Sequence, residues 1–458
     1  MTQLISNTES QKLTDNSTLK NVNRNNPPIK KNGNQNIIKN EDRRIHDWYR
    51  FVLAFPPHLV REYFRLFNLG PKSCVLDPFC GTGTTLVEAK LNQIPSIGIE
   101  ANPFAHFASK VKVSWDIDPE ALLKASQKII NLAEKILLAD GIDDSRESKE
   151  YNSNLNFRRL DEAAEKLIIT GSISPLPLHK ALVLLDCIND YKGKPYYEHL
   201  LLAFANALVY KYSNLHFGPE VGVGRKINDV YATRIWFNEI KKISSDIQHV
   251  KKVTDTSSIT ILADSREVNL LIPHHRVDAV ITSPPYPNEK DYTRTTRLES
   301  VILGFIDSKE ELRSFKKSLI RSNTRNIYKD DSDDEWIKKF DDVIKISDEI
   351  EQKRIALGKN SGFERMYSKV TKQYFGGMAR HLANLRIVLK PGARLAYVVG
   401  DQASYLQIMI RTGRLLAKIG ESLGYEIEDI NLFRTRFSTS SKSYLNEEVV
   451  ILRWPGET

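Results

Sequence analysis

Two short segments of the chain combine residue types that can bind a small ligand and act on it. The first, residues 77–85, reads DPFCGTGTT. Gly81 and Gly83 lack a Cβ, so the backbone here can adopt positive φ and approach a ligand closely. A helix starting at this point would aim N–H groups at an anionic group, with Thr84 and Thr85 as capping hydroxyls. The segment has neither the dinucleotide-binding spacing nor a P-loop lysine.

An acidic residue one element later strengthens this interpretation. Glu100 ends the run SIGIE, residues 96–100. A carboxylate at the end of such a strand can accept hydrogen bonds from two ribose hydroxyls. The alternative is an ordinary strand–turn–helix with a glutamate on the surface. The two features together favour a ligand that resembles a nucleoside.

The second segment, residues 282–286, reads TSPPY and follows the apolar run VDAVI. Pro284 and Pro285 fix φ and present carbonyls without competing N–H groups. Beside them, Ser283 adds a hydroxyl and Tyr286 a flat ring. Converging acceptors and an aromatic face suit a planar ring with an exocyclic amine, such as a base turned out of its stack. A surface loop is the alternative, because proline pairs are common in loops.

Both segments stand where a predicted strand ends, which requires a fold that brings strand ends together. About seven strand candidates alternate with helices, and the last two form a closing pair. This pattern predicts an α/β fold with a doubly wound, mostly parallel seven-stranded sheet. The candidates are residues 74–79, 96–100, 258–264, 276–285, 393–401, 425–434 and 447–454.

Interruptions of this β/α pattern suggest the domain organisation. Residues 1–44 are rich in Asn, Ser, Thr and Lys, which predicts a disordered arm. The catalytic domain is predicted to comprise 45–113 and 258–458. Between these parts, 114–257 carries apolar residues at helical spacing and is predicted to be a mostly helical insertion. A charged stretch, 295–370, forms a second insertion within the catalytic domain.

Composition narrows the classes of protein that remain. With 458 residues, 41% hydrophobic and 27% charged, the chain can bury a core and is not disordered throughout. Only three cysteines occur, and no Cys/His spacing suggests a metal site. The net charge of +9 is compatible with nucleic acid but is weak support by itself. No signal peptide or spanning segment is visible, so a cytoplasmic protein that does not bind membranes is expected.

Taken together, the two segments closely resemble the S-adenosylmethionine-dependent amino-methyltransferases of DNA. Phe79, Gly81 and Gly83 match the cofactor loop FxGxG of that family, and 283–286 matches its tetrapeptide [DNS]PP[YFW] in the Ser form. The resemblance covers most of 45–113 and 258–454. It implies a Rossmann-like methyltransferase fold with S-adenosylmethionine as cofactor. The cofactor-binding residues that it implies are Asp77, Phe79, Gly81, Gly83, Thr84, Glu100 and Asp264, the last placed against the adenine.

The resemblance also implies the reaction. The exocyclic amine of a flipped base attacks the methyl group of the cofactor directly, while the Ser283 hydroxyl and the Pro284 carbonyl accept hydrogen bonds from the amine. Pro285 completes the rigid turn, and Tyr286 stacks on the base. Alignment of the two reactants can supply about 7–11 kcal/mol at best. Cytosine-C5 methylation is excluded, because that class needs a cysteine nucleophile, usually after proline, and no Pro-Cys pair occurs.

Within the family, serine at the first tetrapeptide position is typical of cytosine-N4 enzymes. The favoured function is therefore a site-specific N4-cytosine methyltransferase acting on double-stranded DNA. It would form part of a restriction-modification system with a cognate endonuclease, as a monomer or weak dimer. An adenine-N6 DNA methyltransferase and an RNA amino-methyltransferase of the same fold remain as alternatives.

Two regions are candidates for reading the target. One is the loop 216–226 within 114–257, which ends in two cations. The other follows Tyr286 and could neutralise several phosphates, which makes binding sensitive to salt. An ordinary solvated surface is the alternative for each, and the acidic run 330–336 should lie away from DNA. The cations of the second region are Lys290, Arg294, Arg297, Arg313, Lys316, Lys317, Arg321 and Arg325.

Overall fold

The computed structural model describes residues 38–51, 54–145, 156–218, 220–250, 255–288, 290–438 and 442–456. Most of the predicted arm 1–44 lies outside these ranges, but its last residues are folded. Ile38 and Asp42 are buried, and the Asp42 carboxylate pairs with Arg61 at 2.7 Å. The folded part therefore begins before Ile45, because this short segment contributes both an apolar side chain and an ion pair.

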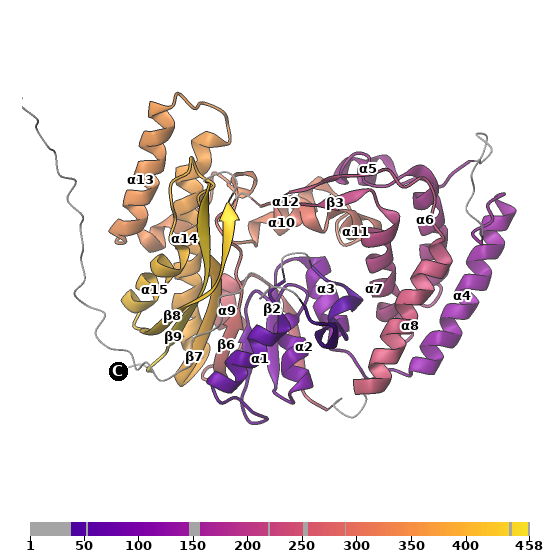
Figure 1. The fold of residues 1–458 in the computed structure, drawn as a ribbon, viewed down its shortest axis with the longest axis horizontal. Coiled ribbons are helices and arrows are strands. Elements are labelled where there is room, and N and C mark those ends of the chain that lie inside the picture. Colours follow the sequence, from indigo (N-terminus) through magenta and orange to yellow (C-terminus); the bar gives the residue numbers. More distant parts are fainter. Residues whose placement is uncertain are drawn as a thin grey trace, which may run out of the picture. The chain divides into compact units, whose positions relative to one another are not determined.

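A seven-stranded sheet forms the centre of the fold, as the alternating pattern predicts (Figure 1). Its first five strands are parallel, and β9 runs antiparallel to both of its neighbours. The fold is therefore α/β, with a mostly parallel sheet that ends in a strand pair. The spatial order is β5 (Ser258–Leu262), β2 (Ser96–Glu100), β1 (Val75–Asp77), β6 (Val277–Thr282), β7 (Leu389–Gly400), β9 (Ser443–Arg453) and β8 (Glu426–Ser438).

Helices cover both faces of this sheet, which explains why its central strands are apolar throughout. Along β7, Ala396 and Val398 belong to the core that includes α1 (Pro57–Leu66). The alternate residues, Tyr397 and Val399, belong to the core with α14 (Tyr367–Leu385) and α15 (Thr412–Ser422). This alternation is the two-residue period of a strand. Two further helices follow the first two strands: α2 (Thr84–Leu91) and α3 (Pro103–Lys112).

The segment between α3 and β5 is mostly helical and also contains a small hairpin. The hairpin lies where the sequence suggested only a flexible loop. Apolar residues of these helices share one core with Phe104 and Phe107 of α3. The elements are α4 (Pro119–Ala139), α5 (Glu162–Leu167), α6 (Pro175–Asn189), α7 (Tyr197–Ala207), β3 (Leu215–Phe217), β4 (Val221–Val223) and α8 (Ala232–Val250).

The stretch between β6 and α14 is built from short helices. A 3-10 helix, Asp333–Ile337, packs against α14. The α-helices of this stretch are α10 (Tyr292–Thr295), α11 (Arg297–Ile302), α12 (Lys309–Lys317) and the longer α13 (Asp341–Ala356). One further helix, α9 (Val268–Leu271), lies between β5 and β6. None of the helices within the described ranges is long and apolar enough to cross a lipid bilayer.

Replacing Gly376 with alanine should destabilise the fold where α14 meets Asp333–Ile337. A Cβ at Gly376 would stand 2.0 Å from the backbone oxygen of Asp333, so one backbone must move. Overpacking of this kind costs about 1–3 kcal/mol. In the control Gly362→Ala, the added Cβ meets nothing within 4 Å. Urea unfolding of both variants measures the difference, and equal stabilities would contradict the packing described here.

Candidate active site

The sheet reverses its strand order between β1 and β6. From β1 the chain continues outward to β2 and β5, whereas β6 is followed by β7 on the other side. Ligands of open α/β sheets bind in the crevice beyond the carboxyl ends of the strands at such a point. DPFCGTGTT leaves the carboxyl end of β1, and TSPPY leaves that of β6. The topology therefore brings the two segments to one place.

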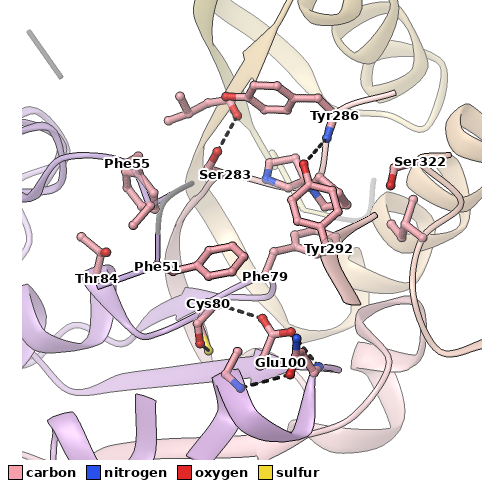
Figure 2. Close-up of a pocket in the computed structure, with 18 of the residues that line it drawn as sticks. Phe51, Phe55, Phe79, Cys80, Thr84, Glu100, Ser283, Tyr286, Tyr292 and Ser322 are labelled. Atoms are coloured by element: carbon pink, nitrogen blue, oxygen red, sulfur yellow. Dashed lines mark hydrogen bonds between the residues drawn. The ribbon is translucent and has the colours of Figure 1, made fainter. Parts of the chain in front are cut away.

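A cavity of about 280 Å³ lies at this point, and both segments line it. Figure 2 shows Glu100 toward one end of the space, with Ser283 and Tyr286 toward the other. Three of the predicted site residues do not line it: Asp77, Gly83 and Asp264. The predicted residues that do line it are Phe79, Gly81, Thr84, Glu100, Ser283, Pro284, Pro285 and Tyr286.

The first loop has the backbone that its glycines predict. Gly81 and Gly83 have φ of 52° and 84°. A Cβ on Gly83 would lie 3.0 Å from the Cβ of Ser109 in α3, so a larger residue would push the loop from the helix. The expected capping by threonine is wrong: Gly83 is the N-cap, and no side chain caps α2. Thr85 instead donates its hydroxyl to the Ile281 carbonyl at 3.1 Å, which ties α2 to β6.

Glu100 presents a buried carboxylate to the cavity. Its two oxygens accept hydrogen bonds from the backbone N–H groups of Gly81 and Asn102, each at 2.8 Å. These bonds fix the carboxylate and connect it to the glycine loop. Burial raises the pKa of Glu100 to about 7, against the lowering effect of the two N–H groups. Each oxygen keeps a lone pair, so the group can also accept from a diol, as a ribose would require.

Asp77 lies outside the cavity lining and contacts both loops that form the site. Its carboxylate accepts hydrogen bonds from the Thr282 hydroxyl at 2.6 Å and from the Phe79 N–H at 3.1 Å. Thr282 is the last residue of β6, so this side chain links the starts of the two loops. Burial raises the pKa of Asp77 to about 6, although both hydrogen bonds oppose the shift. The side chain thus holds the two loops together, and its role in cofactor binding stays a prediction.

An Asp77→Asn variant tests this burial through its pH dependence. Since the folded-state pKa of about 6 lies above the unfolded value of about 3.9, folding favours the protonated carboxyl. The stabilisation is complete below about pH 4 and is lost as the pH rises through about 6. The free energy of unfolding of the variant, relative to the original chain, should therefore rise by about 2–3 kcal/mol over that range. Urea unfolding at several pH values measures it, and a difference independent of pH would contradict the burial.

Asp264 engages a neighbouring cation rather than the cavity. Its carboxylate pairs with Arg266 at 2.5 Å, and Arg266 also pairs with Asp333 of the acidic run. The two residues that flank it, Ala263 and Ser265, line the cavity. The residues on both sides of Asp264 therefore line the cavity, whereas its carboxylate pairs with Arg266, and the contact to adenine stays a prediction.

The second loop is fixed on several sides. The Ser283 hydroxyl donates to the Val398 carbonyl at 3.2 Å, and the Tyr286 N–H donates to the Tyr292 hydroxyl oxygen at 3.2 Å. The Tyr286 hydroxyl donates to Glu447 of β9 at 3.0 Å. Its ring packs on Gly400, where a Cβ would lie 3.0 Å from the ring. These contacts hold the ring in place as part of the cavity wall.

Further lining residues come from segments in which the sequence showed no chemical motif. Phe51 and Phe55 come from the segment that precedes α1. Arg434, Arg436 and Glu447 come from the last two strands. Nothing in the sequence marks Arg434, Arg436 or Glu447, because only the strand order brings β8 and β9 beside the second loop.

Several cations that were predicted to contact phosphate are neutralised within the protein. The acidic run 330–336 was expected to lie away from DNA and so from these cations. Instead, it supplies the partners of two of them. The run therefore lowers the charge that this region can offer to an anion. The pairs are Lys316–Asp291 at 3.2 Å, Lys317–Asp330 at 2.6 Å and Arg321–Asp331 at 2.8 Å.

Comparison with known proteins agrees with this geometry. The family model for DNA methylases of the N6/N4 type matches residues 6–110. Type II methyltransferase M.BsoBI of Geobacillus stearothermophilus is 26% identical over 425 residues, covering 88% of this chain and 83% of the relative. Type II methyltransferase M.AvaI of a Nostoc species is 29% identical over 448 residues, with the same two shares.

The solved structure of TrmN from Thermus thermophilus aligns with this chain over 90% of this chain and 53% of the TrmN chain. Its TM-score is 0.30 and its identity 12%, too low to bear on the function. The family match and the Type II relatives agree with the two motifs and with the sheet that joins them. This chain is therefore similar, in its motifs and in its matches, to the S-adenosylmethionine-dependent amino-methyltransferases of DNA.

Proposed function

We propose that the protein transfers a methyl group from S-adenosylmethionine to the exocyclic N4 amine of a cytosine turned out of duplex DNA. The observation that carries this proposal is the shared cavity. Glu100, suited to a ribose, and Ser283, suited to an amine, line the same space. A donor and an acceptor of a methyl group can therefore meet there without a relay through the protein. The Type II names of the relatives support a restriction-modification role.

The first loop and Glu100 would hold the cofactor. Glu100 accepts from the ribose hydroxyls, Phe79 lies against the ligand, and the N-terminal end of α2 behind Thr84 favours a carboxylate. When bound, the cofactor supplies a methyl group on a positively charged sulfur. This set of groups would fit such a molecule, since Glu100, Phe79 and Thr84 at the start of α2 line one cavity.

The second loop would prepare the amine. Because the Ser283 hydroxyl donates its hydrogen to Val398, its oxygen keeps lone pairs that can accept from the amine. The Pro284 carbonyl is the second acceptor. These hydrogen bonds concentrate the nitrogen lone pair, which is otherwise delocalised into the ring. In the transfer a nitrogen–carbon bond forms, the carbon–sulfur electron pair returns to sulfur, and one amine proton is released.

We also propose that the hairpin β3–β4 and the region after Tyr286 read the target together. Arg225 and Lys226, just past β4, are exposed. Glu220, beside the hairpin, pairs with Arg325 at 3.7 Å, so the two predicted recognition regions are neighbours. The insertion 114–257 would then contribute its hairpin to recognition, while its helices support the hairpin from behind.

Incubation with labelled cofactor and duplex DNA, followed by mass spectrometry of the nucleosides, tests the proposal. N4-methylcytosine is the expected product. N6-methyladenine would instead assign the adenine alternative, and transfer to RNA alone would assign the RNA enzyme. No transfer to any nucleic acid would overturn the proposal. Sequencing of the product maps the modified site, and a cognate endonuclease should fail to cut DNA methylated there.

A further inference from the structure

Two cations meet at the cavity on the side of the second loop. Lys290 lies four residues after Tyr286, and Arg436 lies on β8. Both line the cavity. Burial lowers the pKa of Lys290, and the positive charge of Arg436 lowers it further. The carboxylates of Glu220 and Glu447 oppose the shift, but they already pair with Arg325 and Arg434. The two side chains are therefore close enough to repel each other in a partly dehydrated place.

The nearby carboxylates are already engaged. Glu447 pairs with Arg434 and accepts the Tyr286 hydroxyl. Within the described ranges, no ion pair joins a carboxylate to Lys290 or to Arg436. The Arg436 guanidinium donates instead to a neutral backbone group, the Asp401 carbonyl, at 3.1 Å. Like charges that are held together without an ion-pair partner of their own form a site for an anion, because the bound anion removes their repulsion.

Two ligands could supply this anion: the cofactor, with its carboxylate, and the nucleic acid, with its phosphates. The position of the two cations indicates which of them is closer. The cofactor segments leave β1 and β2, whereas Arg436 lies on β8 at the far edge of the sheet. Lys290 follows the loop that would hold the base. The cofactor carboxylate would lie at the start of α2, so the nucleic acid is the closer source. A base that has been turned out of the duplex also brings its own phosphate to the rim of the pocket.

We propose that Lys290 and Arg436 bind the phosphodiester beside the flipped nucleotide. This inference rests on the proposed function and adds a phosphate-binding site to it. The site would hold the backbone of the extruded nucleotide while the second loop holds its base. Contacts to phosphate fix position and carry no sequence information, so the pair would serve every target equally.

Single variants Lys290→Ala and Arg436→Ala test the site by equilibrium binding to the mapped duplex at several salt concentrations. Each should weaken DNA binding roughly tenfold and lower the slope of log K against log salt by about 1. Cofactor affinity should stay unchanged. The charge-matched control Lys72→Ala with Arg276→Ala removes exposed cations that precede β1 and β6, at the opposite ends of these strands. This control should retain the original affinity and slope.

A duplex with one methylphosphonate next to the modified nucleotide locates the contact. The original protein should lose affinity for this neutral linkage, whereas the Lys290→Ala/Arg436→Ala variant should bind both duplexes equally. A variant that distinguishes the duplexes as the original protein does would overturn the site. Weaker cofactor binding by the variants would assign the anion to the cofactor and also overturn it. If the original protein methylates no DNA, the proposed function fails first, and the inference fails with it.

Discussion

Glu100→Ala should bind S-adenosylmethionine about 10²–10⁴-fold more weakly than the original chain. The carboxylate is buried, fixed by two N–H groups and directed into the cavity. Hydrogen bonds to a charged group contribute about 1.5–3 kcal/mol each, and a ribose offers two hydroxyls. Titration calorimetry with the cofactor measures the loss. Unchanged affinity would remove Glu100 from the cofactor site.

Glu100→Gln separates charge from shape. The amide is the same size but can accept only one of the two backbone hydrogen bonds, so its thermal unfolding should fall modestly below that of the original chain. In the original chain, cofactor affinity should fall as the pH drops below about 7, because protonation of Glu100 removes the charged acceptor. Affinity of the Gln variant should not change over this range. A pH dependence that persists in the variant would point to another group.

Ser283→Ala should lower kcat about 10²–10³-fold while cofactor affinity stays within about twofold. Removal of one preorganised hydrogen-bonding group that acts on the reacting atoms has an effect of this size. The variant keeps the rigid Pro284-Pro285 turn, so the loop should stay in place. Single-turnover methylation of duplex DNA measures the chemical step directly.

Ser322→Ala is the matched control for this loss. Ser322 lines the same cavity, but it is drawn away from Ser283 (Figure 2). Its loss should leave the rate within about threefold, since nothing places its hydroxyl on the amine. Full activity of Ser283→Ala would exclude the hydroxyl from catalysis. An equal loss in both variants would show that the cavity is sensitive to any such change, which would contradict a specific role for Ser283.

Local sequence predicted the parts of the site that are contiguous in the chain. Gly81 and Gly83 required an unusual backbone, and the structure has positive φ at both. Residues 393–401 were predicted to form a strand, and their continuous apolar run, Leu395–Val399, lies within β7. Since carboxyl ends of neighbouring parallel strands share one edge, two motifs at strand ends could be expected to meet once the sheet was predicted.

Side-chain partners over long sequence distances were not predictable in this way. Asp77 and Asp264 looked like cofactor ligands, yet each has a partner that sequence could not name: Thr282 is 205 residues away from Asp77. A carboxylate near a ligand segment can face the ligand or support the segment. The choice depends on which polar groups the fold places behind it.

The sequence by itself determined the strands of the main sheet and the two chemical loops, because these depend on short-range periodicity and on a few residues at fixed spacing. The class of reaction follows from the family resemblance that these loops carry. Tertiary structure alone decided that Lys290, Arg436 and Glu447 meet at the second loop, and that acidic residues neutralise several of the nearby cations. Such contacts follow from the order of strands in the sheet. That order is set by long-range packing, which no local pattern encodes.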